Sequence, residues 1–532
     1  MAEPASRYAA PHPFSAAEGW RIERLTPPSR LFGANGLRTG LDGRIYVAQV
    51  PGSQVSAIDP ESGAITTISP MGGAVVAPDD LVFDDAGNMY LTEITENRVT
   101  MLTPNGTHRV IRGDMPVANP ITWHQGKLIA GECRMGGRIM ELDLAGGAPR
   151  MIAQDVPMAN AFEVGPDGKL YFPVMGTNQI WRVDLAGGAP EVVVGDLGVP
   201  DSVKFDSKGR IVSTQVASGQ VLRIDPATGA REVLAQLEPG LDNCTFVGDR
   251  LFVSSIPGEV TEILGGGQVR SLIPRGLQWP LGLAAGAEGE LFVADGAFSY
   301  FHAGDQPRTI ACMLFTAGGP GFVRGVCAGS AVGEWIVTTG LGSVARYRVG
   351  EESEWLAHGY DRLMGVATND KGAVVFAEYG AGRVHVAEGG TVREIASGLD
   401  KPMGVAVDGD TAYVTEAGTG RIVRLRQGRP VETVAEGFGR PEGLCVVEGK
   451  LIVVDVAKKA VFSVDRESGA VETLAENLPV GAPAGVTPKV LGPIGDMAGP
   501  MIPFAGIAAG ADGALYVSGD AEGSVLMLRK VS

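Results

Sequence analysis

Apolar and polar positions repeat along the whole chain with a period of about 40 residues. Residues 199–235 (VPDSVKFDSKGRIVSTQVASGQVLRIDPATGAREVLA) and residues 440–475 (RPEGLCVVEGKLIVVDVAKKAVFSVDRESGAVETLA) each contain four short apolar stretches separated by turn signals. This pattern predicts a four-stranded antiparallel meander in each module. Tight connections are marked by Asp-Gly pairs, as at Asp42-Gly43, Asp167-Gly168 and Asp512-Gly513.

Twelve such modules can be counted from the residue at which the first strand of each is expected to start. Successive starts are 39 to 44 residues apart, except for a gap of 63 before the last. A four-stranded repeat of this length is typical of a β-propeller blade, and one ring usually holds 4–8 blades. We therefore predict an all-β chain of twelve blades in two six-bladed propellers. The starts are Asn35, Asp79, Asn119, Asn160, Asp201, Asp242, Leu281, Arg324, Met364, Met403, Glu442 and Ala505.

The N-terminal segment contains the kind of strand that the last module lacks. Residues 20–25 (WRIERL) look like a fourth strand, whereas the chain ends on a third strand at 524–531. We expect the N-terminal strand to complete the last blade, which would protect an exposed sheet edge. The domains are then 1–29 (tail and closing strand), 30–274 (first propeller) and 275–532 (second propeller, with a long loop at 476–504). Whether the rings are sequential or share blades from both chain ends stays open.

The amino-acid composition accounts for the many turns and argues against some classes of binding partner. The 532 residues include 77 glycines and 34 prolines, which suits many short strands, and 45% are hydrophobic, too many for a disordered chain. Lys+Arg is 44 against Asp+Glu 61, a net charge of −17, which disfavours nucleic acid and anionic membranes. No apolar run approaches ~18 residues and no secretory leader is visible. Five scattered cysteines indicate a protein of the reducing cytoplasm. With nucleic acid and membranes disfavoured, we expect a small-molecule substrate.

The candidate site lies in the first propeller. All six of its starting positions are Asp or Asn, and two of its second strands end in Glu93 and Glu132. These positions are expected to converge at the mouth of the channel, where carboxylate and amide oxygens suit a hard cation such as Ca²⁺. The alternative is that these residues cap loops through Asx turns. The candidate metal ligands are Asn35, Asp79, Asn160, Asp201 and Asp242, and the candidate catalytic residues are Asn119, Asp201, Glu93 and Glu132.

The second propeller serves as an internal comparison. Its starting positions are mostly apolar, so the fold itself does not require Asp or Asn there. We expect a largely apolar, structural channel. Arg324 and Glu442 stand three blades apart, and we predict that they form an ion pair across it.

At these positions the chain resembles the SMP-30/gluconolactonase/LRE-like propellers, with wider likeness to NHL-repeat and virginiamycin B lyase-like propellers. The order Asn119, Asn160, Asp201 is similar to the family's Asn, Asn, Asp series, and Asn35 stands where the family places Glu. The resemblance implies one divalent metal in the channel, most often Ca²⁺, with Mg²⁺, Mn²⁺ or Zn²⁺ as other options. A neutral residue at position 35 leaves Asp79, Asp242, Glu93 or Glu132 to supply the missing charge.

Three functions follow as hypotheses. The first is a metal-dependent hydrolase that opens a lactone or ester, with Asp201, Glu93 or Glu132 as general base. The second is a lyase or isomerase that removes a proton beside a metal-polarised carbonyl with the same groups. The third is a non-catalytic propeller that binds a protein or peptide.

Overall fold

The protein is almost entirely β-structure. A computed structural model describes residues 4–302 and 307–531. Within these ranges the helices are two single 3₁₀ turns, η1 (Ile94–Glu96) and η2 (Met175–Thr177). The strands form twelve antiparallel sheets, eleven with four strands and one with five, as expected for propeller blades. The all-β prediction is confirmed.

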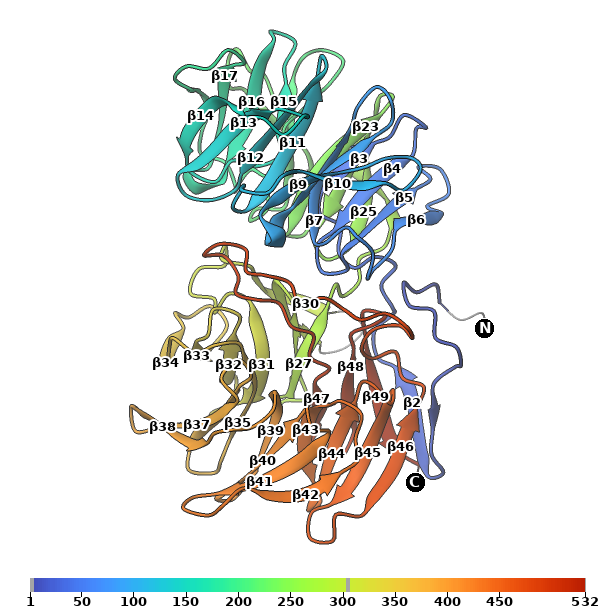
Figure 1. The fold of residues 1–532 in the computed structure, drawn as a ribbon, viewed down its shortest axis with the longest axis vertical. Helices are drawn as coiled ribbons and strands as arrows, with labels where there is room; N and C mark the ends of the chain where they lie inside the picture. The colour runs from blue at the N-terminus through green and yellow to red at the C-terminus, as the bar shows by residue number, and fades with distance from the viewer. Residues whose placement is uncertain (1–3, 303–306, 532) are drawn as a thin grey trace. The chain divides into compact units, whose positions relative to one another are not determined.

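The first six sheets are each built from four consecutive strands (Figure 1). They comprise β3 (Leu37–Thr39), β4 (Ile45–Gln49), β5 (Gln54–Ile58) and β6 (Ile65–Ser69); β7 (Pro78–Phe83), β8 (Met89–Glu93), β9 (Arg98–Leu102) and β10 (His108–Arg112); β11 (Ala118–His124), β12 (Lys127–Glu132), β13 (Gly137–Leu142) and β14 (Arg150–Val156); β15 (Glu163–Val164), β16 (Lys169–Val174), β17 (Gln179–Asp184) and β18 (Glu191–Val194); β19 (Lys204–Phe205), β20 (Ile211–Thr214), β21 (Gln220–Ile224) and β22 (Arg231–Gln236); and β23 (Leu241–Val247), β24 (Arg250–Ser255), β25 (Glu259–Gly265) and β26 (Gln268–Ile273).

The next five sheets follow the same rule, and the last sheet has three strands from this part of the chain. They comprise β27 (Pro280–Ala285), β28 (Leu291–Asp295), β29 (Phe298–His302) and β30 (Pro307–Cys312); β31 (Val323–Ala328), β32 (Trp335–Thr339), β33 (Val344–Tyr347) and β34 (Glu354–Ala357); β35 (Leu363–Thr368), β36 (Val374–Glu378), β37 (Arg383–Glu388) and β38 (Thr391–Ala396); β39 (Pro402–Asp408), β40 (Thr411–Glu416), β41 (Arg421–Arg426) and β42 (Glu432–Glu436); β43 (Pro441–Val447), β44 (Lys450–Asp455), β45 (Ala460–Asp465) and β46 (Val471–Glu476); and β47 (Ile507–Ala509), β48 (Leu515–Gly519) and β49 (Ser524–Lys530).

The N-terminal segment supplies the missing outer strand. Strand β2 (Trp20–Arg24) pairs antiparallel with β49, so that Trp20 faces Lys530 and Arg24 faces Leu526. The prediction that the N-terminal strand completes the last sheet is confirmed. A further short strand, β1 (Ser15–Ala16), pairs with β46 and makes the preceding sheet five-stranded. Both additions cover outer edges that would otherwise be open to pairing with another chain.

The chain divides into two compact units. The first unit comprises residues 30–276 together with 487–496, and the second unit takes the remainder, including the N-terminal segment. The long connection between β46 and β47 is therefore divided between the two units, whereas the sequence predicts that all of it belongs to the second propeller. The physical reason is local contact: Lys489 Nζ donates to the Gly73 carbonyl at 3.4 Å, and Gly492 packs against the Thr95 carbonyl.

The hydrophobic core of each unit lies between neighbouring sheets. One cluster joins Leu37 and Val47 of the first sheet to Phe252 and Val260 of the sixth, so these two sheets pack against each other. A hydrogen bond of 2.7 Å from Ser254 Oγ to the Asn35 carbonyl joins the same two sheets near the starts of their first strands.

Similar hydroxyl-to-carbonyl bonds join other neighbours and fix where each first strand begins. Thr92 Oγ1 donates to the Asn119 carbonyl at 2.7 Å, and Thr415 Oγ1 donates to the Glu442 carbonyl at 2.7 Å.

Candidate functional site

The six Asp and Asn residues that lie beside the starts of the first strands of the first unit are all buried, at 3% to 8% exposure. We call them the Asn/Asp ring. In three of these six sheets the pairing register shifts beside the ring residue, between Pro78 and Leu81, between Ala118 and Ile121, and between Leu241 and Cys244. Such irregularities re-aim a side chain out of the regular alternation of a strand. The members of the ring are Asn35, Asp79, Asn119, Asn160, Asp201 and Asp242.

Hydrogen bonds connect neighbouring members of the ring. Asn35 Nδ2 donates to Asp242 Oδ2 at 3.2 Å, and Asn160 Nδ2 donates to Asp201 Oδ2 at 2.9 Å. The amide oxygens of both asparagines accept backbone N–H groups, at Val50 and Ala161 respectively. Asn35 and Asn160 therefore orient the two aspartates.

The carboxylates of the ring repel one another. Burial raises the pKa of Asp79 and of Asp201 well above its ordinary value, and in each case Asp242 and Asp80 raise it further. Burial, with Asp80 next, raises the pKa of Asp242 to about 7. Negative charge concentrated in a buried place is costly unless a cation or a proton compensates it.

Two buried oxygens of the ring have no hydrogen-bond partner among the described residues. Oδ1 of Asn119 and Oδ1 of Asp201 are buried and accept no hydrogen bond from the described residues, and the same holds for Oδ1 of Asn243 next to the ring. All are hard oxygen donors, the type that Ca²⁺ and Mg²⁺ prefer. Within the described ranges, no group of three or more His, Cys, Asp and Glu side chains is placed to hold a metal ion. A ligand set drawn from the ring would therefore include amide oxygens.

Arginines bind the carboxylates of Glu93 and Glu132, so neither carboxylate is available as a metal ligand or general base. Glu93 accepts hydrogen bonds from Arg98 Nε and Thr100 Oγ1, each at 2.8 Å. Glu132 is paired with Arg134 at 3.0 Å and also with Arg138. Both carboxylates are fully buried, and their oxygens are occupied within their own sheets.

A second set of charges was missed by the sequence analysis. The Arg38 guanidinium donates to the Leu81 carbonyl at 2.9 Å and pairs with Asp80 at 3.3 Å. Lys204 is 3% exposed, and its Nζ has no partner among the described residues. Burial and the nearby Arg38 lower the pKa of Lys204. Both cations stand three residues after a ring residue, Arg38 after Asn35 and Lys204 after Asp201, so the sequence contained a signal for them.

The equivalent positions of the second unit form a different ring, which we call the second ring. The predicted ion pair between Arg324 and Glu442 is wrong. Glu442 instead binds Arg440 Nε at 2.8 Å and accepts the Ala505 N–H at 2.7 Å. Arg324 lies over the Trp279 ring, 5.6 Å from its centroid. The members of the second ring are Leu281, Arg324, Met364, Met403, Glu442 and Ala505, all buried.

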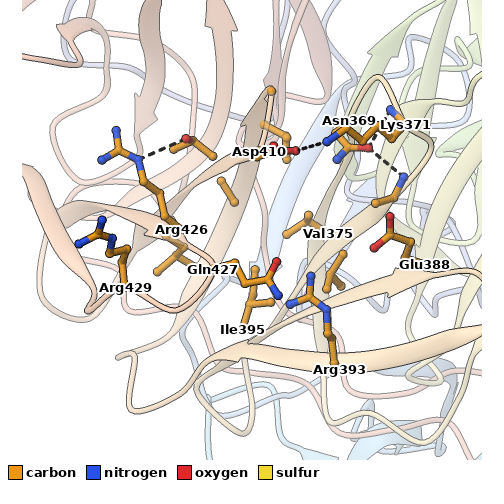
Figure 2. A pocket seen from close by; sticks show the side chains of 17 residues that line it. Asn369, Lys371, Val375, Glu388, Arg393, Ile395, Asp410, Arg426, Gln427 and Arg429 are labelled. Atoms are coloured by element: carbon orange, nitrogen blue, oxygen red, sulfur yellow. Dashed lines mark hydrogen bonds and ion pairs between the residues drawn. The ribbon is translucent and has the colours of Figure 1, made fainter.

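A groove of about 460 Å³ lies between two sheets of the second unit, away from the second ring (Figure 2). It is lined by charged side chains, among them Lys371, Arg393 and Arg429, and by apolar side chains such as Val375 and Ile395. Lys371 is paired with Asp410 at 2.8 Å, as Figure 2 shows. The groove has no buried catalytic group, and the Asn/Asp ring remains the candidate site.

Two further observations concern the class of protein. No disulfide bond joins two of the cysteines that the structure describes. Among the residues described, no helix has the length and apolar character needed to span a membrane.

Comparison with known proteins confirms the resemblance over part of the chain. Residues 124–257 match a family model described as SMP-30/Gluconolactonase/LRE-like region. This span contains Asn160, Asp201 and Asp242 of the ring. No curated protein matches the chain.

Three solved structures match part of this chain. A streptogramin B lyase is 17% identical, with 52% of this chain and 94% of that chain covered and a TM-score of 0.39. Virginiamycin B lyase from Staphylococcus aureus is 15% identical over 54% and 97%, with a TM-score of 0.38. A putative gluconolactonase is 16% identical over 49% and 100%, with a TM-score of 0.39.

Proposed function

We propose that this chain, which resembles the SMP-30/gluconolactonase/LRE-like region over residues 124–257, is a divalent-metal-dependent hydrolase that opens a lactone or ester at the Asn/Asp ring. We further propose that the twelve sheets form two six-bladed propellers, with the ring at the channel of the first. The hydrogen bond from Ser254 to Asn35, which links the sixth sheet to the first, supports this closure. The observation that carries the functional proposal is the set of buried, mutually repelling aspartates beside the unpartnered Oδ1 atoms of Asn119 and Asp201.

The donor set fits a hard cation. One or two of Asp79, Asp201 and Asp242 would supply charge, and the unpartnered Oδ1 of Asn119 would supply a neutral oxygen. Asn35 and Asn160 hold two of the aspartates in place through their amide N–H groups. Ca²⁺ is the first choice, with Mg²⁺, Mn²⁺ or Zn²⁺ as alternatives, because the donors are all oxygen. When bound, such an ion polarises a carbonyl and lowers the pKa of a water molecule.

The residues of the chain perform the remaining steps. Burial of the ring excludes bulk water and strengthens every electrostatic interaction inside it. Oδ2 of Asp201 is fixed by Asn160, which leaves Oδ1 free to accept a proton from an attacking water. Glu93 and Glu132 take no part, because arginines and a threonine already occupy their oxygens.

The lyase alternative uses the same groups, since proton removal beside a carbonyl also needs a base and a polarising ion. The product distinguishes the two, because a hydrolase adds water across the opened bond whereas a lyase leaves a double bond. The screen should therefore identify products by mass.

The test is a panel of lactones and esters assayed with the purified protein before and after EDTA treatment. We expect turnover that EDTA abolishes and added Ca²⁺ restores, and that Asp201→Ala lacks. Glu442→Gln is the matched control, because it changes an equally buried carboxyl at the corresponding position of the second ring. Turnover that survives both EDTA and Asp201→Ala would contradict the proposal.

A further inference from the structure

The second ring contains a buried cation, Arg324, whose terminal nitrogens form no hydrogen bond with the residues that the structure describes. Arg324 is 1% exposed, and neither its Nη1 nor its Nη2 has a hydrogen-bond partner among the described residues. A guanidinium stays charged in proteins and carries five N–H donors. Leaving such a charge buried and unpaired is strongly unfavourable.

Glu442, the one acidic side chain of the second ring, does not form an ion pair with Arg324. Both oxygens of Glu442 are engaged, one by Arg440 and the other by the Ala505 N–H. Burial alone lowers the pKa of Arg324 to about 10, and no neighbouring carboxylate offsets this effect. The other members of the ring are alanine, leucine and methionine.

The guanidinium is held in a fixed place. It lies over the Trp279 ring, and the backbone of that tryptophan is anchored because its N–H donates to Asp295 Oδ1 at 2.6 Å. On another side, a Cβ on Gly340 would lie 3.0 Å from Arg324 Nη2, so the backbone closely approaches the charged group there. Gly499, from the long connection, packs against the Gly340 carbonyl and encloses this part of the ring.

We propose that Arg324 anchors an anion-binding site in the second unit, which takes the carboxylate or phosphate group of a small molecule. Its planar N–H fork suits either group, because both can accept two parallel hydrogen bonds. The Trp279 face and the apolar ring members favour a ligand in which the anionic group is attached to a compact, mainly apolar body. This site is separate from the Asn/Asp ring and does not depend on the hydrolase proposal.

The test compares wild type with Arg324→Met in thermal unfolding, with EDTA present so that no metal site contributes. The probes are sodium acetate and sodium phosphate, each against sodium chloride at the same ionic strength. We expect at least one probe to raise the Tm of the wild type by several degrees over chloride at saturation, and neither to do so for Arg324→Met. In chloride alone the variant should melt above the wild type, because the unpaired charge is gone. A response to acetate alone identifies a carboxylate site, and a response to phosphate alone identifies a phosphate site.

Arg421→Met is the matched control, since Arg421 is an arginine of the same unit that is already paired with Glu416. It should keep the full anion response. An equal anion response in wild type and Arg324→Met overturns the proposal, as does the absence of any response in the wild type. If Arg324→Met does not fold, Arg324→Lys replaces it in titration calorimetry. Loss of the planar fork should then weaken anion binding roughly 10-fold, and unchanged affinity overturns the proposal.

Discussion

Replacing Asp242 by asparagine should stabilise the metal-free protein at alkaline pH. Burial and Asp80 raise the pKa of Asp242 from 3.8 to about 7. An acid whose folded pKa is raised contributes stability that is complete below pH 3.8 and is lost as the pH rises through 7. At about 1.4 kcal/mol per pH unit, the loss amounts to about 4 kcal/mol, of which about 3 kcal/mol falls between pH 5 and pH 8.

Asparagine at this position removes the charge and keeps an oxygen. That oxygen can still accept the hydrogen bond from Asn35 Nδ2, whereas the weaker bond of 3.3 Å from Asn243 Nδ2 loses its acceptor. The lost bond costs about 1 kcal/mol. The net gain at pH 8 is therefore about 3 kcal/mol, and the gain at pH 5 is close to zero.

Calorimetric unfolding in EDTA at pH 5 and pH 8 measures this difference. The wild type should lose stability between the two values, and Asp242→Asn should lose clearly less. Addition of Ca²⁺ at pH 8 should raise the Tm of the wild type more than that of the variant, because the variant offers one charge fewer. A variant less stable than the wild type at pH 8 in EDTA, or a wild type insensitive to pH, would refute the reasoning.

Three further predictions concern the frame around the ring. Glu93→Gln should lower the free energy of unfolding by about 1–3 kcal/mol because Arg98 loses its charged partner, and it should leave the bound metal unchanged. Urea unfolding and metal analysis check both, and lost metal would show that Glu93 is a ligand. Ser254→Ala removes the bond to the Asn35 carbonyl and should cost about 1 kcal/mol, with a larger drop in hydrogen-exchange protection at β3 than at β9; equal drops would contradict the closure of the first unit. Deletion of residues 1–29 uncovers β49 and removes the pairing of Arg24 with Glu522, so size-exclusion chromatography should show aggregation, and a stable monomer would contradict an edge-protecting role.

The repeat of about 40 residues predicted the four-stranded sheets, because the order of strands in each sheet follows from backbone pairing between consecutive strands. Asn35 and Asp242 came out as neighbours since the sixth sheet packs against the first. The closing strand at 20–24 was predictable because the last module lacked a fourth strand of its own.

Side-chain partners were less predictable, because a position in a strand does not determine where a long side chain points. Glu442 binds Arg440, which lies only two residues away, in preference to Arg324 three sheets away. Glu93 was predicted as a base, yet Arg98 at the start of the next strand of the same hairpin already pairs with it. In this case the sequence contained the evidence for the ion pair, because Arg98 lies directly across the hairpin turn from Glu93.

The most direct test of the central claim is the metal content of the purified chain, measured by inductively coupled plasma mass spectrometry for wild type and Asp201→Ala. The account predicts about one equivalent of a divalent cation, Ca²⁺ first, in the wild type and much less in the variant. Wild-type protein that holds no divalent metal after incubation with Ca²⁺, Mg²⁺, Mn²⁺ and Zn²⁺, or a variant that retains the full equivalent, would contradict it.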